Sequence, residues 1–293
     1  MAQVRAVVVW LAFTFPLVLV LAGCGSVRAP MREGREDDAT RVRTSAPVRA
    51  VSDPALLALR VIVQQPGWPG GRPVVAPGDR RLPCERLKCV ALTFDDGPFD
   101  HTASVLDTLA AFQARATFFV VGQMVTPATA PLLRRMVSEG HQLGNHSWDH
   151  PALTSLSGDA LHAQLERTQQ VVRSVTGVTM RLMRPPYGAT DGKVAGETGR
   201  SGLAQILWDL DTLDWRDRNS ALVAQRAGAA RPGAVVLLHD IHRTTAEALP
   251  RLLADLRARG YTFVTVSELY GGRELVPGRR YAGETAQDGR PSP

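Results

Sequence analysis

Cysteine and aromatic residues are scarce in this chain of 293 residues, which has three cysteines and 6% aromatic residues. No second pair of closely spaced cysteines exists, which argues against a metal site built on them. No run of Lys or Arg is interleaved with aromatic residues and no recognition-helix pattern occurs, so the net charge of +6 does not indicate a nucleic-acid partner. That charge suits either an anionic envelope surface or an ordinary solvated surface. Fibrous and low-complexity patterns are also missing, and the length allows one α/β domain with flanking segments.

The first 23 residues have the pattern of a secretory signal. Arg5 precedes an almost unbroken apolar run over residues 6–22. The run ends in Leu-Ala-Gly-Cys at residues 21–24, which resembles a bacterial lipoprotein box, where the signal is removed and the cysteine is lipidated. The resemblance implies an exported protein anchored to a membrane through Cys24, at the periplasmic face of the cell envelope. No Asp follows Cys24, so we expect the outer rather than the inner membrane. An ordinary cleaved signal and a transmembrane anchor are the alternatives.

The segments that flank the predicted domain are polar and lack apolar periodicity. Residues 24–85 mix charges with Ala, Ser, Thr and Pro and become rich in Gly and Pro after residue 64, which predicts a flexible tether. Residues 272–293 are predicted to be a disordered tail. Cys84 and Cys89 lie directly before the first predicted strand. In an oxidising compartment this spacing predicts a disulfide between them.

Residues 86–271 alternate between apolar strand patterns and longer helical patterns. The predicted strands are 89–94, 116–121, 141–144, 180–184, 204–210, 234–239 and 261–266, and the predicted helices are 102–113, 127–139, 158–175, 220–229 and 245–259. This alternation predicts βαβ units and a parallel sheet. Seven such strands suit a closed or nearly closed barrel, in which the chemistry lies at the carboxyl ends of the strands.

Polar residues cluster where five of these strands end. Asp95 and Asp96 alone are typical of a strand-to-loop cap, but the Gly97-Pro98 turn that follows would let both face one cleft. His146 and His150 are four residues apart, and such a pair is commonly structural. With a carboxylate it becomes a two-histidine, one-carboxylate metal site with open positions, as a catalytic metal requires.

The five strand ends resemble, in order and spacing, the five motifs of the polysaccharide deacetylases, the NodB-homology domain or carbohydrate esterase family 4. The matching segments are Asp95-Asp96-Gly97-Pro98, His146-Ser147-x-x-His150, Arg184-Pro185-Pro186-Tyr187, Asp211-x-x-Asp214-Trp215 and Leu237-x-His239. The resemblance implies a distorted (β/α) barrel with fewer than eight strands, in agreement with the seven predicted above.

The resemblance also implies a role for each motif residue. Asp96, His146 and His150 would bind a divalent metal, with Zn²⁺ expected before Co²⁺, Mn²⁺ or Ni²⁺. Asp95 would be the general base, held in place by Arg184.

At the other side of the site, His239 would be the general acid, paired with Asp214. The backbone N–H of Tyr187 would stabilise the oxyanion. Trp215 and Leu237 would form the apolar wall for the acetyl methyl group.

By this resemblance the chain is a metal-dependent hydrolase. It would act, as a monomer, on N-acetylglucosamine residues of a polysaccharide such as peptidoglycan, poly-N-acetylglucosamine or a chitin-like oligosaccharide, and would release acetate. An O-deacetylase of the acetyl xylan esterase type is one alternative. A non-catalytic glycan-binding lipoprotein is another, and the presence of Asp95 and His239 argues against it.

Overall fold

The structure is a computed structural model that describes residues 80–283. The predicted signal over residues 1–23, Cys24, the tether as far as residue 79 and the tail beyond residue 283 lie outside the described residues. Within residues 80–283, no helix combines the length and the apolar character needed to cross a membrane.

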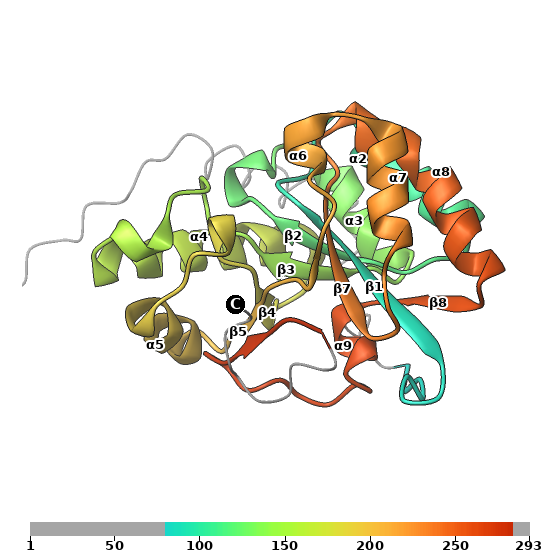
Figure 1. Cartoon of the computed structure of the whole chain (residues 1–293). Coiled ribbons are helices and arrows are strands. Elements are labelled where there is room, and N and C mark those ends of the chain that lie inside the picture. The colour runs from blue at the N-terminus through green and yellow to red at the C-terminus, as the bar shows by residue number, and fades with distance from the viewer. Residues whose placement is uncertain (1–79, 284–293) are drawn as a thin grey trace, which may run out of the picture. The chain divides into compact units, whose positions relative to one another are not determined.

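Nine strands make up one sheet in which every hydrogen-bonded pair is parallel (Figure 1). Eight of them follow the order β6-β7-β1-β2-β3-β4-β5-β9, and β8 pairs with β1. The strands are β1 (Lys88–Asp95), β2 (Thr117–Val120), β3 (Gln142–Asn145), β4 (Leu182–Met183), β5 (Ala204–Ile206), β6 (Leu210–Asp211), β7 (Ala234–His239), β8 (Tyr261–Val264) and β9 (Arg280–Tyr281). No ladder joins β6 to β9 within the described part of the chain, so the barrel is incomplete. The predicted distorted (β/α) barrel is confirmed, but the described residues form nine strands where seven were predicted.

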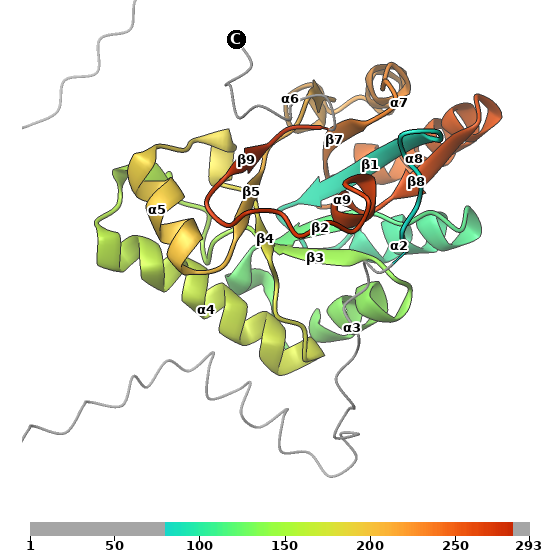
Figure 2. The same ribbon diagram turned by 90° about the horizontal axis from the view of Figure 1, so that it is seen from below.

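Helices surround the strands, as the view in Figure 2 shows for α2 to α5, α7 and α8. The helices are α2 (Thr102–Ala111), α3 (Ala130–Ser138), α4 (Gly158–Thr176), α5 (Gly192–Arg200), α6 (Asp214–Asp217), α7 (Ser220–Gly228), α8 (Arg243–Ala258) and α9 (Val266–Leu269), with 3₁₀ turns η1 (Gly122–Met124), η2 (Leu153–Ser155) and η3 (Pro186–Gly188). Each crossover returns the chain to the edge where the strands begin. All strands are therefore parallel, and their carboxyl ends lie at the same edge of the sheet.

Strand β1 lies at the centre of the sheet because it pairs with three other strands. Along one edge it pairs with β7 over residues 90–95. Along the other edge, β8 takes residues 88–91 and β2 takes residues 93–95.

Alternation along β1 separates an apolar face from a face that becomes polar at its end. Val90, Leu92 and Phe94 are fully buried in the core beneath the surrounding helices. The alternate residues point to the inside of the barrel, since side chains alternate along a strand. Near the carboxyl end these inner residues are Thr93 and Asp95, both buried. The position of the Asp95 carboxylate is therefore set by the same alternation that forms the core.

The strand prediction was wrong in two places. The predicted strand 204–210 is interrupted and forms β5 and β6. The first part of the predicted disordered tail instead returns to the sheet, because β9 pairs with β5 through Gln205–Arg280 and Ile206–Tyr281. Tyr270 also fixes this segment, since its hydroxyl donates to the carbonyl of Gly283 at 2.9 Å.

Helix α5 was not predicted. Its sequence contains Gly196 and Gly199, which weaken a helical pattern. Asp191 begins the helix by accepting a hydrogen bond from the N–H of Val194 at 2.8 Å. The returning segment packs closely on α5 at Gly278, where an added Cβ would be 2.7 Å from the carbonyl oxygen of Ala195.

The chain is already packed against the domain at residue 80, before the predicted tether ends. Arg80 donates two hydrogen bonds, of 2.7 and 2.9 Å, to the buried carboxylate of Glu268 in α9. Cys84 and Cys89 form a disulfide, and both are buried. The Arg80 contacts join the segment before β1 to α9, and the disulfide closes a short loop at the start of β1.

Candidate metal centre and catalytic groups

Asp95 and Asp96 leave β1 by different routes. Asp95 is the last residue of the strand and lies in register with His239 of β7 and Phe119 of β2. Asp96 has a left-handed φ of 73°, so the chain bends one residue before the predicted turn. Both carboxylates consequently face Nε2 of His146, with oxygen–nitrogen distances of 3.6 Å from Asp95 and 3.4 Å from Asp96. On a regular strand the side chains of neighbouring residues point to opposite faces. The bend at Asp96 lets both carboxylates face the same side.

The loop after β3 brings His146 and His150 together without a helix. Ser147 and His150 have left-handed φ values of 66° and 62°. The side chain of Asn145 accepts a hydrogen bond from the N–H of Ser147 at 2.9 Å, and the hydroxyl of Ser147 accepts one from the N–H of His150 at 3.1 Å. The tight loop places the two imidazole centroids 4.9 Å apart.

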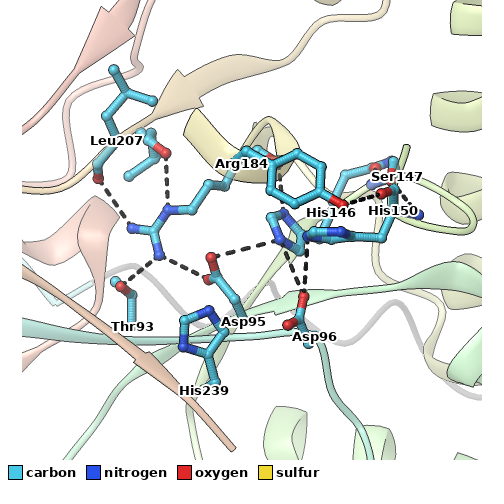
Figure 3. Close-up of polar contacts among 12 residues, drawn as sticks. Thr93, Asp95, Asp96, His146, Ser147, His150, Arg184, Leu207 and His239 are labelled. Atoms are coloured by element: carbon cyan, nitrogen blue, oxygen red, sulfur yellow. Dashed lines mark hydrogen bonds and ion pairs between the residues drawn. The ribbon is translucent and has the colours of Figure 1, made fainter. Parts of the chain in front are cut away.

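Asp96, His146 and His150 direct one ligand atom each toward a common point (Figure 3), and these atoms lie within 4.8 Å of one another. Nε2 of each histidine is 3.4 Å from Oδ1 of Asp96. That oxygen is buried and accepts no hydrogen bond from the described residues. A buried carboxylate oxygen without a donor needs a counter-charge.

The tautomer of His146 indicates what that counter-charge is. Its Nδ1 is 2.7 Å from the carbonyl oxygen of Arg184, which can only accept, so Nδ1 carries the proton. In the neutral ring Nε2 then presents a lone pair to Asp96, which is the usual arrangement of a metal-binding histidine. Two imidazole nitrogens and a carboxylate oxygen are a donor set that Zn²⁺ and related transition ions accept. The residues present therefore fit a divalent metal.

Electrostatics keep the candidate ligands in the states that bind metal. Burial alone would raise the pKa of Asp96, but its interactions with His146, His239 and His150 outweigh burial and lower that pKa to about 2. Burial, together with the charge of His146, lowers the pKa of His150, although the two aspartates oppose this shift. Asp96 is thus ionised and His150 is neutral at neutral pH.

Arg184 fixes the other carboxylate. It follows β4 and is fully buried. One guanidinium nitrogen donates to Oδ1 of Asp95 and to Oγ1 of Thr93, each at 2.8 Å. The other two nitrogens donate to the carbonyls of Ile206 and Leu207, each at 3.0 Å. Oδ1 of Asp95 is held by this network, and Oδ2 is left facing the candidate ligands (Figure 3).

His239 and Asp214 form a second hydrogen-bonded pair beside Asp95. Nδ1 of His239 lies 2.8 Å from Oδ1 of Asp214, and the N–H of His239 donates to Oδ2 at 2.7 Å. The N–H of Trp215 and the hydroxyl of Thr245 also donate to this carboxylate, at 2.9 and 2.7 Å. Burial alone would lower the pKa of His239, but Asp214, with contributions from Asp95 and Asp96, raises it to about 9. His239 is therefore protonated at neutral pH.

Two exposed aromatic residues flank the site. Tyr187 is 69% exposed and has a left-handed φ of 61°. Its ring contacts that of His150 edge-on, with centroids 4.7 Å apart. Trp215 is 47% exposed and directly follows Asp214. Leu237 is buried and lies two residues before His239, on the same face of β7.

The structure thus gathers all ten residues that the sequence assigned to metal, catalysis or substrate at the carboxyl edge of the sheet. The sequence did not identify Thr93 and Thr245, which hold Arg184 and Asp214. Thr93 had a recognisable signal, because it precedes Asp95 by two residues and so lies on the same strand face. Thr245 had none, since it reaches Asp214 from α8, 31 residues away.

Comparisons with known proteins agree with this geometry. The family model for polysaccharide deacetylase matches residues 83–206. A peptidoglycan-N-acetylglucosamine deacetylase of Listeria monocytogenes is 47% identical over 200 residues, which cover 68% of this chain and 42% of that protein. The chain therefore spans less than half the length of that relative.

Two relatives are matched over most of their length. A chitin deacetylase of Colletotrichum lindemuthianum is 35% identical over 217 residues, which cover 69% of this chain and 88% of that protein. The solved structure of a family 4 acetyl xylan esterase of Clostridium thermocellum, in complex with a cobalt ion, is 35% identical with a TM-score of 0.63. That match covers 67% of this chain and 98% of the esterase chain.

Proposed function

Since the chain belongs to the polysaccharide deacetylase family, we propose that it hydrolyses N-acetyl groups of N-acetylglucosamine residues in a cell-envelope polysaccharide. The observation that carries this proposal is the joint placement of a candidate metal site, a carboxylate and a protonated histidine at one strand edge. The similarity to a peptidoglycan-N-acetylglucosamine deacetylase favours peptidoglycan as the polysaccharide.

Asp96, His146 and His150 would hold the metal, and Zn²⁺ suits their two nitrogens and one oxygen. The cobalt ion in the related esterase structure supports a divalent transition metal in this family. When bound, such an ion supplies positive charge that acidifies water and polarises an acetyl carbonyl group.

Asp95 would accept a proton from the attacking water through Oδ2, while Arg184 holds Oδ1. As water adds to the carbonyl carbon, negative charge develops on the carbonyl oxygen, and the backbone N–H of Tyr187 would donate to it. His239 would then give a proton to the amide nitrogen as the carbon–nitrogen bond breaks. The products are acetate and the free amine, and Asp214 keeps the general acid protonated and oriented.

Trp215 and Leu237 would contact the substrate beside His239. Leu237 offers an apolar surface on the same strand face, and the exposed ring of Trp215 offers a face to a sugar. Tyr187 lies across the site beside His150. The exposed aromatic residues suit a polymer that lies across an open site.

We also propose that the protein acts from the membrane. The support lies in the sequence alone: a signal-like segment over residues 1–23 and the resemblance to a lipoprotein box at Cys24. Lipidation at Cys24 would hold the domain at the periplasmic face of the envelope, with the outer membrane favoured.

Acetate release from a panel of polymers tests the activity and the substrate together. We expect release from peptidoglycan, and from chitooligosaccharides or poly-N-acetylglucosamine, and loss of that release after treatment with a chelator. Zn²⁺ added back should restore it. The related acetyl xylan esterase makes O-deacetylation the competing function. Acetate released from acetyl xylan but not from the amide-linked polymers would favour that function and contradict ours.

The pH dependence of kcat/KM is expected to follow His239. This general acid acts when protonated, so activity should fall as pH rises through its pKa of about 9. Asp214→Asn removes the charge that raises this pKa and should move the alkaline limb to lower pH. The interaction of His239 with Asp214 also stabilises the folded protein. This contribution to the free energy of unfolding is complete below the unfolded-state pKa of about 6.5, and it is lost as pH rises through about 9. An alkaline limb that stays in place in Asp214→Asn would exclude His239 as the titrating acid.

A further inference from the structure

Asp240 is a carboxyl group buried next to the site without a role in the proposed reaction. It follows His239 at the end of β7 and is 0% exposed. Oδ2 accepts a hydrogen bond from Oγ1 of Thr102, and Oδ1 has no donor among the described residues. Complete burial raises the pKa of Asp240 to about 7. A buried and incompletely bonded carboxyl group is costly, which suggests that its contacts serve a purpose.

The bonded oxygen of Asp240 is the end of a short chain of hydrogen bonds. The hydroxyl of Thr102, at the start of α2, has one proton and donates it to Asp240. The same hydroxyl accepts a bond from the N–H of Phe99 at 2.8 Å. Thr102 in turn donates through its backbone N–H to the carbonyl of Phe99 at 3.1 Å. Asp240 therefore orients the hydroxyl that holds Phe99, two residues after Gly97.

The carboxyl group of Asp240 also lies directly against Gly97. A Cβ added to Gly97 would be 2.7 Å from Cγ of Asp240 and closer still to both oxygens. Such contacts are shorter than real Cβ atoms make, so any residue with a Cβ here would force the buried carboxyl group of Asp240 or the turn itself to shift. Glycine is required here by close packing and not by a left-handed backbone, since Gly97 has no such φ.

The turn that Asp240 contacts is the one that follows Asp96. Asp96 is a non-glycine residue with a left-handed φ of 73°, a conformation that persists only when its surroundings hold it. Gly97, the residue after Asp96, has contacts on two sides. The carbonyl of Gly97 accepts a bond from the N–H of Val121 at 3.1 Å, and its Cα side packs on Asp240.

We propose that Asp240 is a positioning residue for the candidate metal ligand Asp96. By packing on Gly97 and bonding Thr102, it holds the turn after β1, and this turn keeps the Asp96 carboxylate pointed at both histidines. The inference rests on the proposed function, because it concerns the same metal site.

The test is the dissociation constant for Zn²⁺, measured by competition with a chromogenic chelator. Asp240→Ala is expected to bind Zn²⁺ about 10–100-fold more weakly than the wild type, as outer partners of metal ligands do when removed. Thr102→Val should weaken binding in the same direction. Asp240→Asn keeps the volume and an acceptor oxygen, so its affinity should stay close to the wild-type value.

A matched control separates positioning from general damage. Thr198→Val also removes the hydroxyl of a fully buried threonine, but in α5, where it bonds to Val194 and Gln205. Thr198→Val should lower the unfolding temperature without changing Zn²⁺ affinity. Wild-type Zn²⁺ affinity in Asp240→Ala would overturn the inference. If Asp240→Ala does not fold, wild-type Zn²⁺ affinity in Thr102→Val would overturn it instead. A loss in Asp240→Asn as large as in Asp240→Ala would also overturn it.

A double-mutant cycle tests the contact with Gly97. Gly97→Ala should weaken Zn²⁺ binding because its Cβ meets Asp240. In the Asp240→Ala background the obstacle is gone, so the same change should cost less. Additive losses in the double variant would contradict the packing argument. A wild-type protein that binds no Zn²⁺ would instead refute the proposed function, so the two failures are distinguishable.

Discussion

Asp95→Asn is expected to lower kcat about 10²–10⁴-fold, the range that positioned general bases contribute, while metal binding stays intact. Asparagine keeps the shape of the side chain and an acceptor for Arg184, which is 2.8 Å from Oδ1. It cannot accept a proton at Oδ2, the oxygen that faces the candidate ligands. Acetate release by the zinc-loaded variant, together with elemental analysis of its metal content, measures both effects.

His146→Ala is the matched comparison for that variant. It removes a ligand from the set Asp96, His146 and His150, so metal content and activity should be lost together. Near-normal turnover in Asp95→Asn would exclude Asp95 as the base. Unchanged metal content in His146→Ala would show that the cluster is not the metal site.

Arg184→Ala is expected to lower the free energy of unfolding by about 3–5 kcal/mol and to abolish deacetylation. The guanidinium group is fully buried and donates to Asp95, Thr93 and the carbonyls of Ile206 and Leu207. Burial lowers its pKa, and the charge and hydrogen bond of Asp95 oppose that shift. Without Arg184, the buried carboxylate of Asp95 and three further oxygens lose this donor, and urea denaturation measures the resulting loss of stability.

Two controls sharpen this result. Arg216 is exposed and bonded to Asp217, so Arg216→Ala should leave the free energy of unfolding close to the wild-type value. Asp95→Asn combined with Arg184→Ala removes the unpaired charge, so the double variant should be less destabilised than additivity requires. A loss below about 1 kcal/mol in Arg184→Ala alone would mean that the network contributes little to folding.

Much of the site could be predicted because it follows from local rules. Alternation along β1 places Asp95 inside the barrel, and parallel strands place their carboxyl ends at one edge, so His146, Arg184 and His239 had to converge. The helices and strands with clear periodicity were found for the same reason. The exact pairing of Asp95 with His239 depends on strand register, which these patterns do not specify.

What the sequence could not predict depends on contacts between distant segments. Strand β9 has two residues and a polar surrounding sequence, and only its pairing with β5 makes it a strand. The contact between Gly97 and Asp240 joins residues whose separation gives no signal. Gly97 has the sequence pattern of an ordinary turn residue, although the structure shows that a Cβ there would clash with a neighbouring carboxyl group.

The triple pairing of β1 has a consequence for the motion of the site. Its backbone amides and carbonyls are committed to β7, β8 and β2, so opening this strand requires most of the sheet to separate. Its hydrogen exchange should therefore proceed through global unfolding, as in the most protected segments of other proteins. Tyr187 and Trp215 are exposed and lie in the short helical elements η3 and α6, outside the strand ladders. The paired strand therefore fixes the position of Asp95, whereas the exposed rings of Tyr187 and Trp215 lie outside that constraint.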